Sequence, residues 1–133
     1  MQDALTERLA PLFRAVTDSD GAPIVICAPD HTIVYMNPSA ISRYKKRGGA
    51  ALIGRRLTDC HSPASCELIE KTLRWFRESP GHNRIFEFHS DEENCDVYMV
   101  ALRDPDGALI GYYEKHESRN PETGSRYRFS DAE

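Results

Sequence analysis

The spacing of apolar residues predicts a helix over residues 3–17, ahead of the first strand. Four of its apolar residues repeat at helical spacing: Leu5, Leu9, Leu12 and Val16. Pro11 falls inside this segment, and a proline in a helix interior costs about 3 kcal/mol. We therefore expect a kink or two short helices there. The apolar stripe must be covered by the sheet of the same chain or by another subunit.

The rest of the chain alternates between strand and helix patterns. Strands are predicted at 23–28 and 32–36, joined by the turn Pro29-Asp30-His31. Asn37 is a good N-cap and Pro38 a good first helical residue, so a short helix should follow to about Tyr44. The remaining predicted segments are an irregular stretch or single helical turn at 50–60, a helix at 63–78, strands at 83–90, 95–103 and 108–116, and a polar tail from 118. Strands grouped around a block of helices indicate an α+β fold with an antiparallel sheet.

Length and charge restrict the class of protein. A chain of 133 residues is most simply one domain. Its formal net charge of −4 argues against nucleic acid as the main partner, because phosphate binding requires a basic surface. No apolar run reaches the roughly 18 residues that a membrane span needs, and no signal peptide is apparent. We therefore expect a cytoplasmic protein with reduced cysteines and no membrane contact.

Three segments, in this order, resemble the PAS domain family over about residues 20–117. Residues 33–40 (IVYMNPSA) are similar to the family's strand that leads through Asn-x-Ala into its helices. Residues 52–57 (LIGRRL) resemble the glycine turn before its long helix, and residues 104–111 (DPDGALIG) resemble its last hairpin. The segment 59–65 (DCHSPAS) and the ending Tyr113 to Glu117 are further similar to a bacterial subgroup of small PAS proteins.

The resemblance implies a five-stranded antiparallel sheet with helices on one face and an N-terminal flanking helix. It also implies a pocket between sheet and helices, and a homodimer formed through the N-terminal helix. The implied organisation is a flanking helix at 1–19, a PAS domain at 20–117 and a tail at 118–133. The segment of the flavin-binding light sensors that forms a photo-adduct has no match here, so flavin is not expected.

Cys60 and His61 are the residues with the clearest potential chemistry. They precede a helix N-terminus, whose positive end favours a thiolate at Cys60. The functional interpretation is a reactive thiol or a haem site with His61 as iron ligand. The alternative is structural, with Cys60 packed inward and His61 bonded to loop backbone. A zinc site formed with Cys66 is disfavoured because the ligands are not paired at the usual spacing, so no metal is predicted.

Taken together, the sequence predicts a sensory module and no enzyme, because it contains no nucleophile elbow, phosphate loop or metalloprotease motif. A small ligand would bind between sheet and helices and signal to a partner protein in trans. The residues expected to line that cleft are Tyr35, Tyr44, Leu57, His61, Ile69, Leu73, Phe86 and Tyr98. Two alternatives remain: a haem or thiol redox sensor that uses His61 or Cys60, and a dimerising adaptor without ligand.

Overall fold

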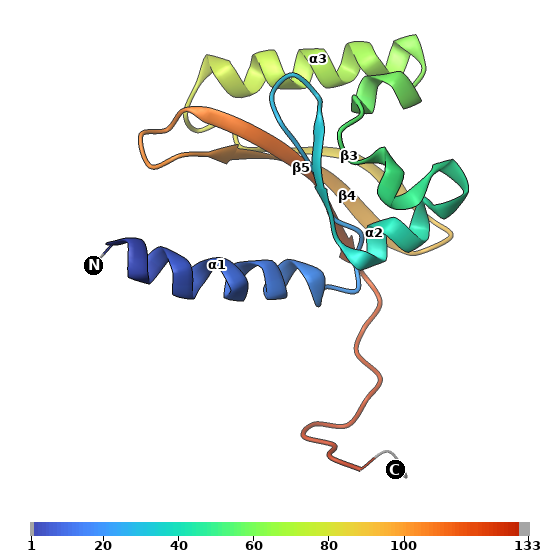
Figure 1. The fold of residues 1–133 in the computed structure, drawn as a ribbon. Coiled ribbons are helices and arrows are strands. Elements are labelled where there is room, and N and C mark those ends of the chain that lie inside the picture. Colours follow the sequence, from blue (N-terminus) through green and yellow to red (C-terminus); the bar gives the residue numbers. More distant parts are fainter. Residues whose placement is uncertain (1, 131–133) are drawn as a thin grey trace.

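The computed structural model describes residues 2–130 of the chain. Its helices and strands, in chain order, are α1 (Gln2–Asp18), β1 (Val25–Cys27), β2 (Ile33–Met36), α2 (Pro38–Arg43), three short 3-10 helices (Lys45–Arg47, Gly49–Leu52 and Leu57–Cys60), α3 (Pro63–Glu78), β3 (Arg84–Ser90), β4 (Cys95–Arg103) and β5 (Leu109–Ser118). Residues 119–130 lead away from the sheet without helix or strand (Figure 1).

The five strands form one antiparallel sheet in the order β2-β1-β5-β4-β3. Helix α3 lies along one face of this sheet, and α1 lies on the opposite side (Figure 1). The predicted fold class is confirmed, and α3 has the bounds that the sequence predicts. At Gly111 the central strands approach so closely that a Cβ atom would lie 2.6 Å from the Cys27 carbonyl oxygen, which explains the glycine.

Two predictions of local structure were wrong. Helix α1 is not divided at Pro11, because a proline's fixed φ is compatible with helix and this part of α1 is exposed, where water can satisfy the freed carbonyl. The segment 50–60 contributes to two short 3-10 helices, Gly49–Leu52 and Leu57–Cys60, in place of one turn.

The segment around Gly54 is attached to the edge of β2 by backbone hydrogen bonds. The amide of Gly54 donates to the carbonyl of Ile33 at 2.7 Å, and the amide of Ile33 donates to Arg55 at 2.8 Å. The amide of Leu57 likewise donates to the carbonyl of His31 at 2.8 Å. Gly54 has a φ of 95°, in the region that favours glycine. These bonds fix where the chain enters the third 3-10 helix.

Helix α3 is fastened to the sheet at its C-terminal end. The guanidinium of Arg103 donates to the carbonyls of Phe76 at 2.5 Å, Ser79 at 3.2 Å and His82 at 3.2 Å. The indole of Trp75 stacks on the ring of His82 at 4.1 Å between centroids. Arg103 therefore satisfies carbonyls that a helix end otherwise leaves without partners.

The other half of α3 packs less tightly. Ile69, Leu73 and Phe76 are buried, whereas Leu68, on the same predicted stripe, is 65% exposed. The N-terminal turn is capped by Ser62, whose hydroxyl accepts from the amide of Ser65 at 3.2 Å. The helix thus begins on a local cap and ends on a clamp from β4.

Asn37 joins three elements through one fully buried side chain. Its Oδ1 accepts from the amides of Ala40 and Ile24, each at 2.9 Å, which caps α2 and extends the β1 edge. Its Nδ2 donates to the carbonyls of Thr17 at 2.9 Å, Ala22 at 3.0 Å and Asp20 at 3.3 Å. The amide therefore fixes the end of α1 against the start of the sheet.

Replacing Asn37 should destabilise the fold more than a surface asparagine does. We expect Asn37→Ala to lower the free energy of unfolding by about 3 kcal/mol, because buried backbone groups lose their partners. Asn37→Ser should recover part of this loss, since a hydroxyl still caps α2. Asn120→Ala is the matched control, because Asn120 is exposed. Urea denaturation measures all three, and equal losses for Asn37→Ala and Asn120→Ala would contradict this role.

Candidate functional site

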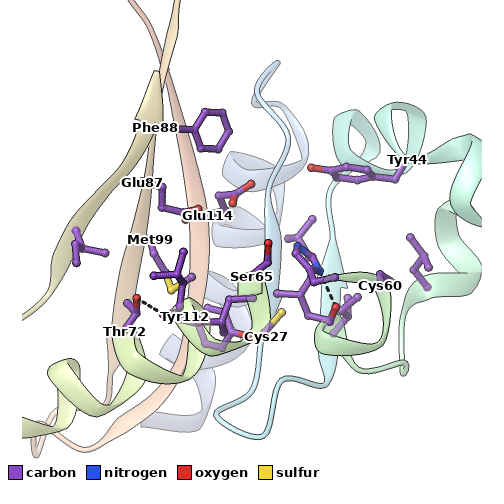
Figure 2. A pocket seen from close by; sticks show the side chains of 18 of the residues that line it. Cys27, Tyr44, Cys60, Ser65, Thr72, Glu87, Phe88, Met99, Tyr112 and Glu114 are labelled. Atoms are coloured by element: carbon purple, nitrogen blue, oxygen red, sulfur yellow. Dashed lines mark hydrogen bonds between the residues drawn. The ribbon is translucent and has the colours of Figure 1, made fainter. Parts of the chain in front are cut away.

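A cavity of about 490 Å³ lies between α3, the 3-10 helices and the inner face of the sheet. Its floor is apolar and comes from the strands, with Cys27, Ile33 and Met99 all buried. Its cover is the first ten residues of α3, which contribute Ser65, Ile69 and Thr72 among others. Figure 2 shows these side chains converging on a common space. A cavity of this size accommodates a small organic ligand.

The structure brings five of the eight residues expected in a cleft to this cavity. These are Tyr44, Leu57, His61, Ile69 and Phe86. Tyr44 comes from the end of α2, and Leu57 and His61 come from the third 3-10 helix and its C-cap. The turn around Gly54, held to β2, places that segment at the cavity wall.

The other three expected residues lie elsewhere. Leu73 is buried in the core beside Phe76. Tyr35 faces the end of α1, where its hydroxyl bonds to the Asp18 carboxylate and lies 3.1 Å from Thr17 Oγ1.

Tyr98 lies on the face of the sheet opposite the cavity, because side chains alternate along β4 and its neighbours Val97 and Met99 point inward. The guanidinium of Arg84 stacks on its ring at 3.7 Å, and Arg119 donates to its hydroxyl at 2.8 Å.

A chain of buried hydrogen bonds connects the cavity wall to α3. The thiol of Cys27 bonds to the hydroxyl of Tyr112. That hydroxyl lies 2.7 Å from Nδ1 of His31, whose Nε2 lies 2.5 Å from the Glu70 carboxylate on α3. With Tyr112 donating to Nδ1, the hydrogen on Nε2 points at Glu70. Tyr112 of β5 then donates to His31 in the β1–β2 turn, and His31 donates to Glu70 of the helix.

Burial keeps Cys27 and Tyr112 of this chain protonated. Burial raises the pKa of the Cys27 thiol to about 11, so the thiol is not a nucleophile at neutral pH. Burial also raises the pKa of Tyr112 far above its ordinary value. His31 itself has a φ of 76°, unusual for a residue other than glycine, and its ring is almost fully buried. His31 thus combines a positive φ with a ring whose two nitrogens both have hydrogen-bond partners.

Two glutamates from non-adjacent strands meet in the cavity. Glu87 of β3 and Glu114 of β5 both line it, and their side chains point toward each other across β4 (Figure 2). The two carboxyls lie close enough to shift each other's pKa. Nε2 of the buried His116 lies 3.2 Å from Oε1 of Glu114. The cavity is therefore apolar except for one acidic wall and a few polar groups.

The two carboxyls have opposite pKa shifts. Burial, followed by the charge and the hydrogen bond of Glu114, raises the pKa of Glu87 from 4.5 to about 8. Burial alone would raise the pKa of Glu114 as well. The hydrogen bond and charge of His116, with the hydrogen bond from Glu87, outweigh burial and hold that pKa below its ordinary value. At pH 7 Glu87 therefore carries the proton and donates to an ionised Glu114.

Comparison with known proteins decides the family. A family model described as the PAS fold matches residues 17–115, which is most of the chain. The chain belongs to the PAS family. A search of curated protein sequences found no match for it.

Solved structures share the fold of this PAS domain at low sequence identity. The C-terminal domain of a protein from Streptococcus mutans has a TM-score of 0.66 at 18% identity, covering 80% of this chain and 81% of that one. A PAS domain from Colwellia psychrerythraea has a TM-score of 0.59 at 14% identity, covering 84% and 96%. A sensory box sensor histidine kinase from Vibrio cholerae has a TM-score of 0.54 at 15% identity, covering 88% and 97%.

Across residues 2–130, no helix of this PAS domain has both the length and the apolar character needed to span a membrane.

Cys60 and His61 lie at one end of the cavity in this PAS domain. The Cys60 side chain is half-buried and lines the wall. Nδ1 of His61 lies 2.9 Å from the carbonyl oxygen of Leu57. This is the kind of contact that the structural interpretation of His61 expects, in which its ring bonds to loop backbone. The neighbouring Cys66 thiol donates to the carbonyl of Thr58 at 3.2 Å. Within the described residues, no three His, Cys, Asp or Glu side chains gather closely enough to hold a metal ion.

The sequence analysis missed the polar groups of this PAS pocket. Glu87 alternates with phenylalanines along its strand, and this pattern predicts that its side chain faces solvent. The other polar groups could have been found from the alternation of side chains along β5, in which every second residue faces the same side. Tyr112, Glu114 and His116 share one face of that strand, and an aromatic residue at its start favours the buried side.

The Glu87 shift predicts a pH dependence of stability. Because the folded pKa of about 8 exceeds 4.5, the folded state binds an extra proton between those values, and the contribution of Glu87 to stability falls as pH rises through that window. Glu87→Gln should remove this decline, since glutamine keeps the hydrogen-bond donor and does not titrate. Urea denaturation from pH 5 to pH 9 tests it, with the exposed Glu67→Gln on α3 as control. Parallel curves for wild type and Glu87→Gln would contradict the shift.

Proposed function

We propose that this PAS domain is a ligand-gated sensory module that binds a small molecule in the cavity between α3 and the sheet. The observation that carries the proposal is the 490 Å³ cavity, whose wall residues Cys27 and Tyr112 are hydrogen-bonded through His31 to α3. The role is binding and signalling in trans, not catalysis. The Vibrio cholerae relative, a sensor histidine kinase, supports a sensory role by analogy only.

The proposed mechanism couples cavity occupancy to the position of α3. A ligand beside Tyr112 favours one arrangement of its hydroxyl, and the hydroxyl controls the ring of His31 that holds Glu70. Because α3 also covers the cavity, its N-terminal half both contacts the ligand and responds to it. A ligand shifts this equilibrium only by the difference in its affinity for the two arrangements.

Filling the cavity should prevent ligand binding without unfolding the domain. We expect Cys60→Trp, which adds a bulky side chain at the wall, to lower fragment affinity at least about tenfold, because it occupies the ligand's volume. The exposed Ser42→Trp on α2 is the matched control. A fluorine-labelled fragment library screened by NMR, and native mass spectrometry of the purified protein, measure occupancy.

The same experiment tests the coupling. A bound fragment should slow amide hydrogen exchange across α3, and Tyr112→Phe should bind the fragment but lose that protection. Failure of wild type to bind any fragment or carry any added mass would favour the ligand-free adaptor. A haem absorption band that His61→Ala abolishes would favour the haem alternative, since the Nδ1 bond to Leu57 leaves Nε2 of His61 for iron. Reversible oxidation that Cys60→Ser abolishes would favour the thiol sensor.

We further propose that two copies associate through α1. Four apolar side chains on its stripe are more than half exposed: Leu5, Leu12, Phe13 and Val16. Helical spacing places Glu7 and Arg14 on the opposite side of α1, so the stripe is free of charge. An uncharged apolar stripe is complementary to itself, as the interface of a two-fold symmetric dimer requires.

A charge on this stripe should disrupt the dimer. We expect Leu12→Asp to weaken self-association at least about tenfold, because the carboxylate would be buried without a partner. Ala10→Asp places the same charge on α1 away from the stripe and should leave association unchanged. Analytical ultracentrifugation of the full chain measures both. A Leu12→Asp variant that sediments like wild type would exclude this interface.

A further inference from the structure

The acidic wall of the cavity restricts what the PAS domain can bind. Most lining residues are apolar, so the body of a ligand must be apolar as well. The Glu87 and Glu114 carboxyls interrupt this lining at one place, directed at each other from β3 and β5. No Lys, Arg or His in the described part of the chain forms an ion pair with Glu87, which is joined to Glu114 alone.

We propose that the pocket binds a cationic small molecule, an ammonium or similar group on an apolar body, with its charge between Glu87 and Glu114. This inference rests on the proposed ligand-binding function and adds the class of ligand. The geometry provides two carboxyls on one wall of a mostly apolar cavity of about 490 Å³. An ammonium group can donate to both at once, because it has up to three hydrogens.

Other ligand classes fit the wall less well. An anion would face the ionised Glu114 across the cavity, and this repulsion is unfavourable. A purely apolar ligand would remove water from the pair and supply no partner in return. A cation compensates for the lost hydration with charge-assisted hydrogen bonds.

The remaining charged and titratable groups around the pair do not reverse this preference. His116 contacts Glu114 and is buried against it, with its side chain 7% exposed. His61 and Tyr44 belong to the elements on the other wall, and Tyr44 faces both Glu114 and Arg47. Arg47 is exposed and is the one Lys or Arg among the lining residues. Its charge lies in the first 3-10 helix (Lys45–Arg47), outside the pair, where its guanidinium would donate to an anionic group of the same ligand.

The shared proton gives the binding reaction a recognisable signature. Below pH 8, Glu87 carries a proton that a cation displaces from the pair to the buffer. Cation binding therefore releases up to one proton, and the affinity rises with pH until Glu87 is ionised in the free protein. A neutral ligand that leaves the pair intact shows neither effect.

Three probes that share one apolar body separate these possibilities: phenethylammonium, phenethyl alcohol and hydrocinnamate. Isothermal titration calorimetry of the full-length protein, in buffers of different ionisation enthalpy, measures affinity and proton release together. We expect phenethylammonium to bind at least about tenfold more tightly than the alcohol, and hydrocinnamate to bind most weakly. Glu87→Gln and Glu114→Gln should each remove the preference for the ammonium.

The neutral probe distinguishes loss of the charge site from loss of the fold. Both variants should keep their affinity for phenethyl alcohol, and the exposed Glu67→Gln should behave as wild type toward all three probes. Alcohol binding as tight as that of the ammonium would overturn the cationic class and leave the ligand-binding function standing. No binding of any probe at millimolar concentration would overturn both. If neither Glu87→Gln nor Glu114→Gln weakens ammonium binding, the cation does not bind between these two glutamates.

Discussion

The junction of α1, β1 and α2 depends on the amide of Asn37. One buried side chain caps α2, bonds the edge of β1 and holds three carbonyls at the end of α1. Only an amide can do this, because the site requires an acceptor on one side and a donor on the other. A carboxylate would face three carbonyl oxygens, and a hydroxyl is too short to reach all of the partners. The start of β1, helix α2 and helix α1 are thereby fixed relative to one another.

The cavity exists because its two sides are built differently. Its floor belongs to a continuous antiparallel sheet, in which backbone hydrogen bonds fix the positions of the side chains. Its cover is a helix held by a clamp at one end and by a single hydrogen-bonded chain near its middle. Towards its N-terminus, before Glu70, the helix leaves Leu68 largely exposed. Such a boundary can hold a ligand or close without one, at little cost to the sheet.

Apolar periodicity and capping residues were enough to predict the strands, α2 and α3 in their order along the chain, but not the undivided α1 or the pairing order of the strands. Ser62 and Pro63 marked the start of α3, because a helix cap depends only on residues within one turn. Such a cap can therefore be recognised from the sequence alone. Tyr98 could not be assigned to a face in the same way, since β4 carries apolar side chains on both sides and only the register decides. Glu87 was missed for a related reason. Polar residues in a strand usually face water, and only the fold shows that its neighbour across β4 is Glu114.

The clamp at Arg103 also determines which part of α3 can travel. A helix of 16 residues is about 24 Å long, and its C-terminal end is pinned to β4 and to the stacked ring of His82. The helix therefore behaves as a lever with its pivot at that end, and the chain at Glu70 acts near the midpoint of the arm. Any rotation produces its largest displacement at Ser62, next to Cys60 and His61. The segment that looked like a reaction centre in the sequence thus lies at the end of α3 farthest from the clamp.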